Sequence, residues 1–198
     1  MTDTPLINVL FDEDAIAERV TSLAHELAEA NLHRLLVVAV LKGSFVFAAD
    51  LIRAMHRIGL TPEMEFIHLS SYGARTQSSG TVNILRDIES DVKDRDVILV
   101  DDILESGRTL AFARDLITGR DARSVKIVAL LDKPQRRIAE IQADYVGFTC
   151  PDKFVVGYGM DMGHAYRQLP FIGYVVEEAD SDSATRASRA QTETEKVL

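Results

Sequence analysis

Acidic, small and hydroxyl residues follow an apolar run in the segment 97–110, VILVDDILESGRTL. The run VILV is typical of a strand buried on both faces, and Asp101 and Asp102 come where such a strand would end. The segment 105–109, ESGRT, then opens a stretch with helical periodicity. A helix N-terminus with hydroxyls and Gly107 favours a phosphate, whereas the two acids favour hydroxyl groups or a metal ion. The pattern therefore predicts a ligand with both a phosphate and vicinal hydroxyls, such as a ribose phosphate.

Strands and helices alternate along the chain, which predicts an α/β fold with a mainly parallel twisted sheet flanked by helices. Apolar runs predict strands at 35–41, 63–69, 97–100, 125–131 and 144–149; periodic segments predict helices at 14–30 and 44–58 and one ending near 118; a Ser/Gly/Thr-rich loop covers 70–83. Lys42, the pair Asp101-Asp102 and Lys133 each follow a predicted strand. We therefore expect them to converge at the carboxyl edge of the sheet, where such folds bind ligands.

Composition narrows the class of protein. The 198 residues are 46% hydrophobic and carry a net charge of −9, which supports one cored domain and argues against binding to nucleic acids or to anionic membranes. A single cysteine, Cys150, and the lack of a signal-like N-terminus or a long apolar run predict a cytoplasmic protein. We expect one domain over residues 1–176 and a disordered polar tail over 177–198.

The 97–110 pattern resembles the phosphoribosyl pyrophosphate (PRPP) motif of type I phosphoribosyltransferases. Further blocks resemble the hypoxanthine-guanine branch of that family in the same order: LKGS at 41–44, SSYG at 70–73, LLDKP at 130–134, YVGF at 145–148 and PDKFVVGYGMD at 151–161, followed by Tyr166-Arg167. The last block belongs to the purine-binding part of these enzymes. The resemblance implies their fold, with a small hood formed by the terminal segments, and transfer of the 5-phosphoribosyl group from PRPP to hypoxanthine or guanine.

The resemblance also implies roles for individual residues. Glu105 would be the catalytic base, and Asp101, Asp102 and Asp161 would associate with Mg²⁺. The other implied contacts are Lys42, Gly43, Asp101, Asp102, Ser106, Gly107, Arg108, Thr109 and Arg167 with PRPP; Lys133, Phe154, Val155 and Asp161 with the 6-oxopurine; and Ser71 and Tyr72 in a mobile lid.

Glu105 departs from the family pattern, which usually carries Asp there. The extra methylene moves the carboxylate by roughly 1.5 Å, a displacement that matters to catalysis. This departure keeps open a PRPP- or nucleotide-binding regulator of the same fold with weak catalysis. A xanthine-preferring transferase is a further alternative, whereas the 151–161 block argues against a pyrimidine. The resemblance suggests a homodimer or homotetramer.

Overall fold

A six-stranded sheet forms the centre of the molecule. The computed structural model describes residues 5–71 and 82–176. The strand order is β4-β3-β2-β5-β6-β7, and all neighbouring strands are parallel except the β3–β4 pair. The bounds are β2 (Leu36–Leu41), β3 (Glu63–Ser71), β4 (Val82–Arg86), β5 (Asp96–Leu104), β6 (Ser124–Asp132) and β7 (Tyr145–Thr149). The predicted mainly parallel α/β fold is confirmed.

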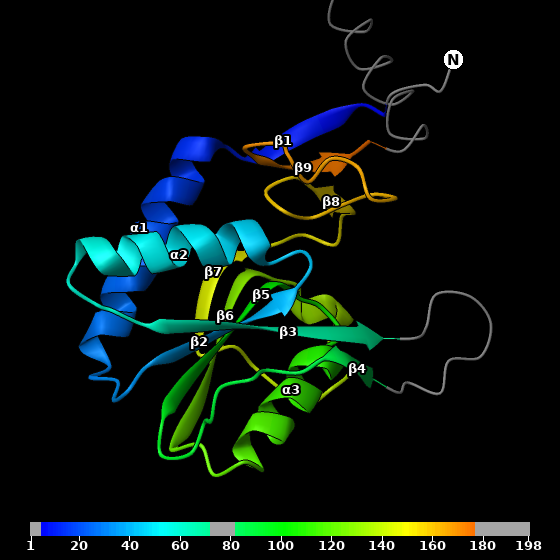
Figure 1. Ribbon diagram of the computed structural model, residues 1–198. Coiled ribbons are helices and arrows are strands. Elements are labelled where there is room, and N and C mark those ends of the chain that lie inside the picture. The colour runs from blue at the N-terminus through cyan, green and yellow to red at the C-terminus, as the bar shows by residue number, and fades with distance from the viewer. Residues whose placement is uncertain (1–4, 72–81, 177–198) are drawn as a thin grey trace, which may run out of the picture.

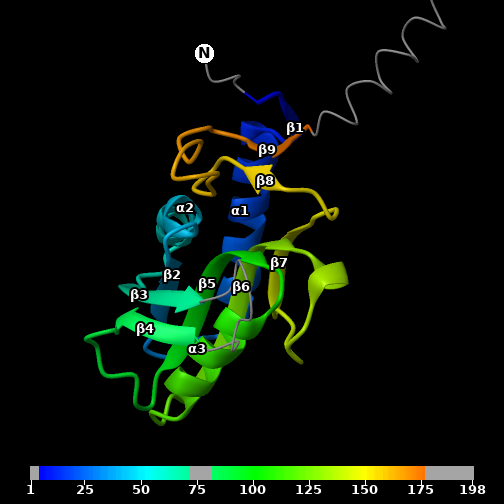
Figure 2. The same ribbon diagram turned by 90° about the vertical axis from the view of Figure 1, so that its right-hand side faces the viewer.

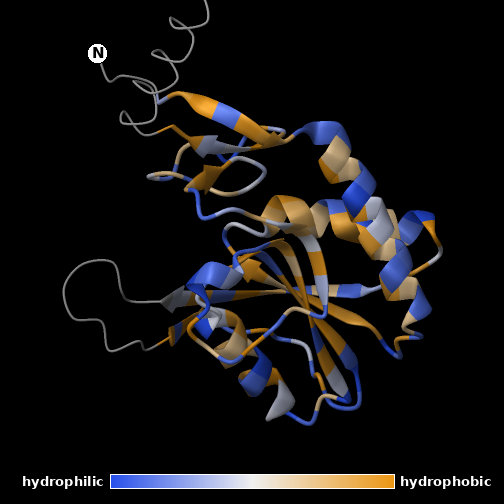
Figure 3. Ribbon diagram, turned by 180° about the vertical axis from the view of Figure 1, so that it is seen from behind, coloured by the Kyte–Doolittle hydropathy of each residue, from blue (hydrophilic) through white to orange (hydrophobic). Residues whose placement is uncertain are grey.

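Helices cover both faces of this sheet (Figure 1). Helices α1 (Glu13–Glu29) and α2 (Phe45–Arg57) pack on one face, and α3 (Arg108–Thr118) packs on the other. Alternate residues of β2 point to opposite faces, so Val37 joins the core with α1 and α2 while Val38 joins the core with α3. The central strands are therefore apolar on both sides, which explains their unbroken hydrophobic runs. In Figure 3 these strands form the hydrophobic interior.

A second, smaller sheet joins the two ends of the described chain. Strand β9 (Ile172–Val175) lies between β1 (Ile7–Phe11) and β8 (Val155–Val156), and both pairings are antiparallel. The small sheet lies beyond α1 and α2 at one end of the molecule (Figure 2). It is the hood that the resemblance implied.

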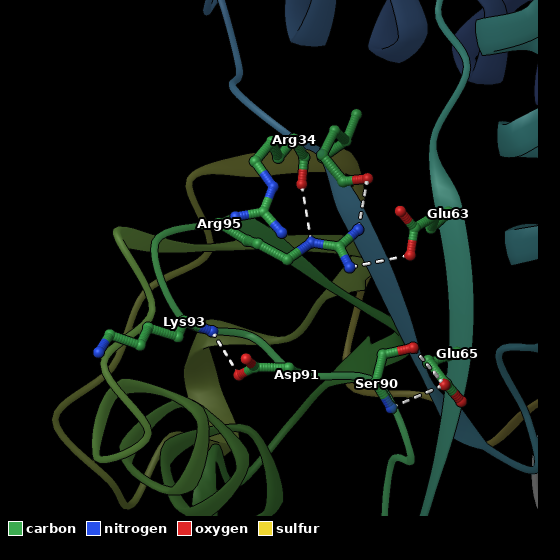
Figure 4. Close-up of polar contacts among 8 residues, drawn as sticks. Arg34, Glu63, Glu65, Ser90, Asp91, Lys93 and Arg95 are labelled. Atoms are coloured by element: carbon green, nitrogen blue, oxygen red, sulfur yellow. Dashed lines mark hydrogen bonds and ion pairs between the residues drawn. The ribbon is translucent and has the colours of Figure 1, made fainter.

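Arg95 joins the amino ends of three strands on the side away from the hood (Figure 4). Its guanidinium is almost fully buried, donates to the carbonyl oxygens of Arg34 and Leu35, and pairs with Glu63 at 2.8 Å. These bonds satisfy a cation that would be costly to bury alone. They fix the start of β2 beside β3 and so contribute to the register with which the strands reach the opposite edge.

Two elements differ from the sequence-based expectation. Strand β5 does not end before Asp101 but continues to Leu104, because its pairing with β6 extends through Asp101↔Ala129 and Leu104↔Asp132. The predicted loop 70–83 begins and ends in strands, since β3 runs to Ser71 and β4 starts at Val82.

Some expectations fall outside the described residues. These are Tyr72 with most of the expected lid, and the tail at 177–198. The division of the chain into a domain and a tail stays a prediction. Within residues 5–71 and 82–176, no helix has the length and apolar character needed to cross a membrane.

Candidate functional site

Two adjoining cavities open at the carboxyl edge of the sheet. The first, of about 340 Å³, is lined by predicted site residues that include Lys42, Gly43, Asp101, Asp102, Glu105, Ser106, Gly107 and Thr109. The second, of about 200 Å³, is lined by residues that include Lys133, Arg136, Phe154, Val155 and Asp161. Asp102, Ile103 and Glu105 line both cavities. The convergence expected from the strand ends is therefore present, and Glu105 lies at the border of the two spaces.

The turn after β2 approaches the acidic pair closely. The peptide bond between Leu41 and Lys42 is cis. A Cβ added to Gly43 would lie 1.6 Å from Oδ2 of Asp102. Only glycine allows this approach, because any side chain would displace the carboxylate. Gly43 thus brings the Lys42 turn and Asp102 to the same cavity.

Asp101 and Asp102 have different hydrogen bonds despite being adjacent. Asp101 Oδ1 accepts from the Asp102 N–H at 3.1 Å, and Asp102 Oδ1 accepts from the Ile103 N–H at 2.9 Å. Burial, and then the neighbouring Asp102 charge, raise the pKa of Asp101 well above its usual value; burial is also the main cause of the raised pKa of Asp102. Desolvated carboxylates side by side are suited to a hard cation or to ribose hydroxyls.

This donor set fits Mg²⁺ when the substrate supplies the remaining ligands. Among the residues that the structure describes, no group of three acidic, histidine or cysteine side chains is arranged to hold a metal. Mg²⁺ is commonly bound through one or two carboxylates together with substrate phosphates and water. Asp101 and Asp102 can provide the protein's share of such a site.

The segment between β5 and α3 forms an anion-binding turn. Gly107 precedes α3 in the left-handed conformation (φ 79°), and a Cβ there would lie 2.5 Å from the Ile141 side chain. Thr109 and Leu110 in the first turn of α3 line the first cavity, and the N–H groups of a first helical turn have no partner within the helix. Arg108 is exposed and lines neither cavity, so the structure does not bring it together with the other residues predicted for PRPP.

Lys133 is buried at the end of β6, with only 4% of its surface exposed. Its Nζ donates to the carbonyl of Lys153 at 2.8 Å and borders the second cavity. An ammonium group almost free of solvent retains strong donors for an additional ligand oxygen. Phe154, by contrast, is 55% exposed and offers an open aromatic face, while Val155 is buried beside it.

Arg167 and Asp161 form an ion pair within the hood. Arg167 Nη2 lies 2.7 Å from Asp161 Oδ1, and Nη1 donates to the carbonyl of Gly159 at 2.6 Å. Asp161 lines the second cavity, but Arg167 instead lines a separate space between the helices and the hood. Burial raises the pKa of Asp102, and the positive charge of Arg167 is a smaller contribution that opposes this rise.

Sequence reasoning missed Arg136 and Arg137. Arg136 Nε lies 3.6 Å from Glu105 Oε1. Arg137 is largely buried and donates to the carbonyl oxygens of Leu104, Glu105 and Ile141. The available signal was two consecutive arginines just beyond Lys133, at the functional edge of the sheet. Ser71 lies at the end of β3, and its side chain is outside the described part of the chain.

Comparisons with known proteins agree with this geometry. The model of the phosphoribosyl transferase domain matches residues 8–162. Over 166 residues the chain is 46% identical to the hypoxanthine-guanine phosphoribosyltransferase of Bacillus subtilis, covering 83% of this chain and 91% of that protein. The chain belongs to the hypoxanthine-guanine phosphoribosyltransferase family. The resemblance inferred from the motifs is thereby confirmed.

Solved structures and longer relatives extend the comparison. A hypoxanthine phosphoribosyltransferase from Staphylococcus aureus matches with a TM-score of 0.82 and 38% identity, over 90% of this chain and 98% of that one. The bifunctional protein TilS/HprT of Listeria monocytogenes is 48% identical over 175 residues, or 88% of this chain. The chain spans about a quarter (26%) of that relative's length.

Proposed function

We propose that this protein transfers the 5-phosphoribosyl group of PRPP to N9 of hypoxanthine or guanine and releases pyrophosphate. The observation that supports this proposal most directly is that two adjoining cavities share Asp102 and Glu105 among their lining residues. One cavity has the donors and carboxylates suited to a ribose phosphate, and the other has a buried cation and an aromatic face suited to an oxopurine. The reacting atoms would meet where the two cavities join.

In the first cavity, the protein binds and orients PRPP. The N–H groups before α3 and the Thr109 hydroxyl hold the 5-phosphate, and Asp101 and Asp102 hold the ribose hydroxyls. Lys42 and the Gly43 backbone receive the pyrophosphate. Mg²⁺ bound together with PRPP would neutralise the negative charge that develops on the departing pyrophosphate.

In the second cavity, the protein binds and orients the base. Lys133 Nζ donates to the exocyclic O6, Phe154 stacks on the ring, and the backbone of Val155 meets the ring edge. Asp161 also lines this cavity. A 6-oxopurine is favoured over adenine because a buried ammonium group pairs with a carbonyl oxygen and repels an amino group.

Glu105 assists the chemical step as a general base. N9 forms a bond to C1 of the ribose, and the bond from C1 to the pyrophosphate oxygen breaks with its electron pair leaving on pyrophosphate. The proton on N7 passes to the Glu105 carboxylate, and the N–H electrons remain in the purine ring. The location of Glu105 at the border of both cavities supports this role.

The direct experiment offers PRPP with hypoxanthine, guanine, xanthine, adenine and uracil in turn and measures nucleotide formation. We expect turnover with hypoxanthine or guanine. Turnover confined to xanthine would identify the alternative transferase, and PRPP binding without turnover would identify a regulatory protein. Either result would contradict the proposal.

Two substitutions at Glu105 test its role. Glu105→Gln keeps the size of the side chain but cannot accept a proton, so turnover should fall by about 10²–10⁴-fold. PRPP affinity, measured by equilibrium binding, should change little. Glu105→Asp tests whether the loop has adapted to the longer side chain. If the loop fits Glu, turnover of Glu105→Asp should be slower than that of the native enzyme. Native turnover in Glu105→Gln would remove Glu105 from the chemistry.

The proposal includes a homodimer or homotetramer in the cytoplasm. Phe45 on α2 and Phe66 on β3 are 44% and 40% exposed, and a subunit contact over them would remove this apolar surface from water. Light scattering coupled to size-exclusion chromatography measures the assembly directly. A monomer at micromolar concentration would contradict this part of the proposal.

A further inference from the structure

Arg136 lies between two carboxylates at the entrance of the second cavity. It ends the short 3₁₀ helix η1 (Pro134–Arg136) that follows β6. Its Nε is 2.5 Å from Asp152 Oδ1 and 3.6 Å from Glu105 Oε1. Asp152 and, to a lesser extent, Glu105 raise the pKa of the Arg136 guanidinium. The Arg136 guanidinium thus interacts both with Asp152 and with Glu105, the proposed base.

The backbone of Glu105 is held independently of Arg136. Arg137 donates from Nε to the Glu105 carbonyl at 3.0 Å and from Nη2 to the Leu104 carbonyl at 3.1 Å. The N–H groups of Ile138 and Ala139 also donate to the carbonyl of Ser106. A change at Arg136 therefore leaves the main chain of Glu105 in place and acts on its side chain.

The Glu105 side chain needs such a constraint more than an aspartate would. Its side chain is 41% exposed, and a glutamate has one more rotatable bond than an aspartate. Without a restraint, the rotamers of Glu105 would place its carboxylate at positions further apart than catalysis tolerates for a reacting group. A cation anchored on the cavity rim reduces this spread.

We propose that Arg136 is a positioning residue for Glu105: anchored by Asp152, its guanidinium holds the glutamate carboxylate toward the base cavity for proton transfer. This inference rests on the proposed function. It also explains how the site accommodates the longer side chain of Glu105. The ion pair with Arg136 restricts the extra rotation that the additional methylene allows.

Other charged side chains lie around Glu105 and Arg136. They are Asp102 from β5, Lys133 at the end of β6, Asp152 and Lys153 from the segment before β8, and Asp161 from the hood. Asp152 differs from the others because it anchors Arg136. Removal of Asp152 should therefore weaken the hold on the Glu105 side chain in the same direction as removal of Arg136, but to a smaller extent.

The test compares Arg136→Gln, Arg136→Lys and Asp152→Asn in steady-state kinetics with hypoxanthine and PRPP. Arg136→Gln should lower kcat by about fivefold, with KM for PRPP nearly unchanged. Arg136→Lys should restore part of kcat. Asp152→Asn should lower kcat by less than Arg136→Gln, because the arginine remains but loses its anchor. Arg114→Gln, on the outer helix α3, is the matched control and should behave as the native enzyme.

A double-mutant cycle with Glu105→Gln decides whether Arg136 acts through Glu105. Without the carboxylate, adding Arg136→Gln should have no further effect on kcat. An equal fivefold loss in both backgrounds would overturn the inference, as would native kinetics in Arg136→Gln. If the native enzyme forms no nucleotide from PRPP and a purine, the proposed function fails first, so the two failures are distinguishable.

Discussion

Gly159→Ala should damage the pyrophosphate end of the site from within the hood. Gly159 has φ +101°, and a Cβ there would lie 2.2 Å from the carbonyl oxygen of Gly43. The contact is between two backbone segments, so no flexible side chain can move aside. The alanine methyl needs about 1.2 Å more space to reach ordinary van der Waals contact, which starts at 3.4 Å. Either the hood or the Lys42-Gly43 turn must shift by that amount.

The expected loss follows from this displacement. A shift of about 1 Å at a positioning element costs roughly 10²-fold in catalysis. The left-handed conformation adds about 1–2 kcal/mol of strain for an alanine, which lowers Tm by about 2–8 °C in a chain of this size. We therefore expect kcat/KM for PRPP to fall by about 10²-fold and the protein to remain folded at 25 °C.

Gly163→Ala is the matched control in the same segment. Gly163 also has a positive φ, +60°, but no described atom lies within 4 Å of its Cβ position. It should show the modest loss of Tm without the loss of kcat/KM. The measurements are initial rates at varied PRPP and thermal unfolding by circular dichroism. Equal kinetics in the two variants would refute the reasoning, because the backbone contact with Gly43 would then have no effect on the site.

Three other predictions concern side chains. Lys133→Ala should weaken 6-oxopurine recognition by about 1.5–3 kcal/mol, roughly 10–100-fold in KM for hypoxanthine, whereas Lys126→Ala should not; equal KM values in the two variants would contradict the O6 contact. Arg137→Lys should lower both Tm and kcat, because the single ammonium nitrogen of lysine cannot reach the three separate carbonyl oxygens that Nε, Nη1 and Nη2 of Arg137 bond; a native Tm would show that these bonds are dispensable. The hydrogen bond from Arg120 holds the pKa of Asp87 below its usual 3.8, so this pair stabilises the fold above that pH and the contribution disappears as pH falls through the lowered pKa. Urea unfolding of Arg120→Gln should therefore show a deficit at neutral pH that closes in acid, and a deficit independent of pH would contradict the assignment.

The sequence by itself determined the architecture and much of the candidate site. Apolar runs such as 97–100 predicted the central strands because parallel strands are buried on both faces. Because the carboxyl ends of such strands meet at one edge, the positions of Lys42, Asp101-Asp102 and Lys133 predicted their convergence, which the structure confirms. The order of the motif blocks along the chain predicted the family.

Only the tertiary structure decided features that depend on partners distant in the chain. The extension of β5 through Asp101 requires the paired edge of β6, and β4 is a strand because it pairs with β3. Arg167 illustrates the same limit for side chains: its position in the chain does not reveal that its guanidinium pairs with Asp161. Periodicity gives the face of an element on which a residue lies. The group that its side chain meets is decided by the packing of elements against one another.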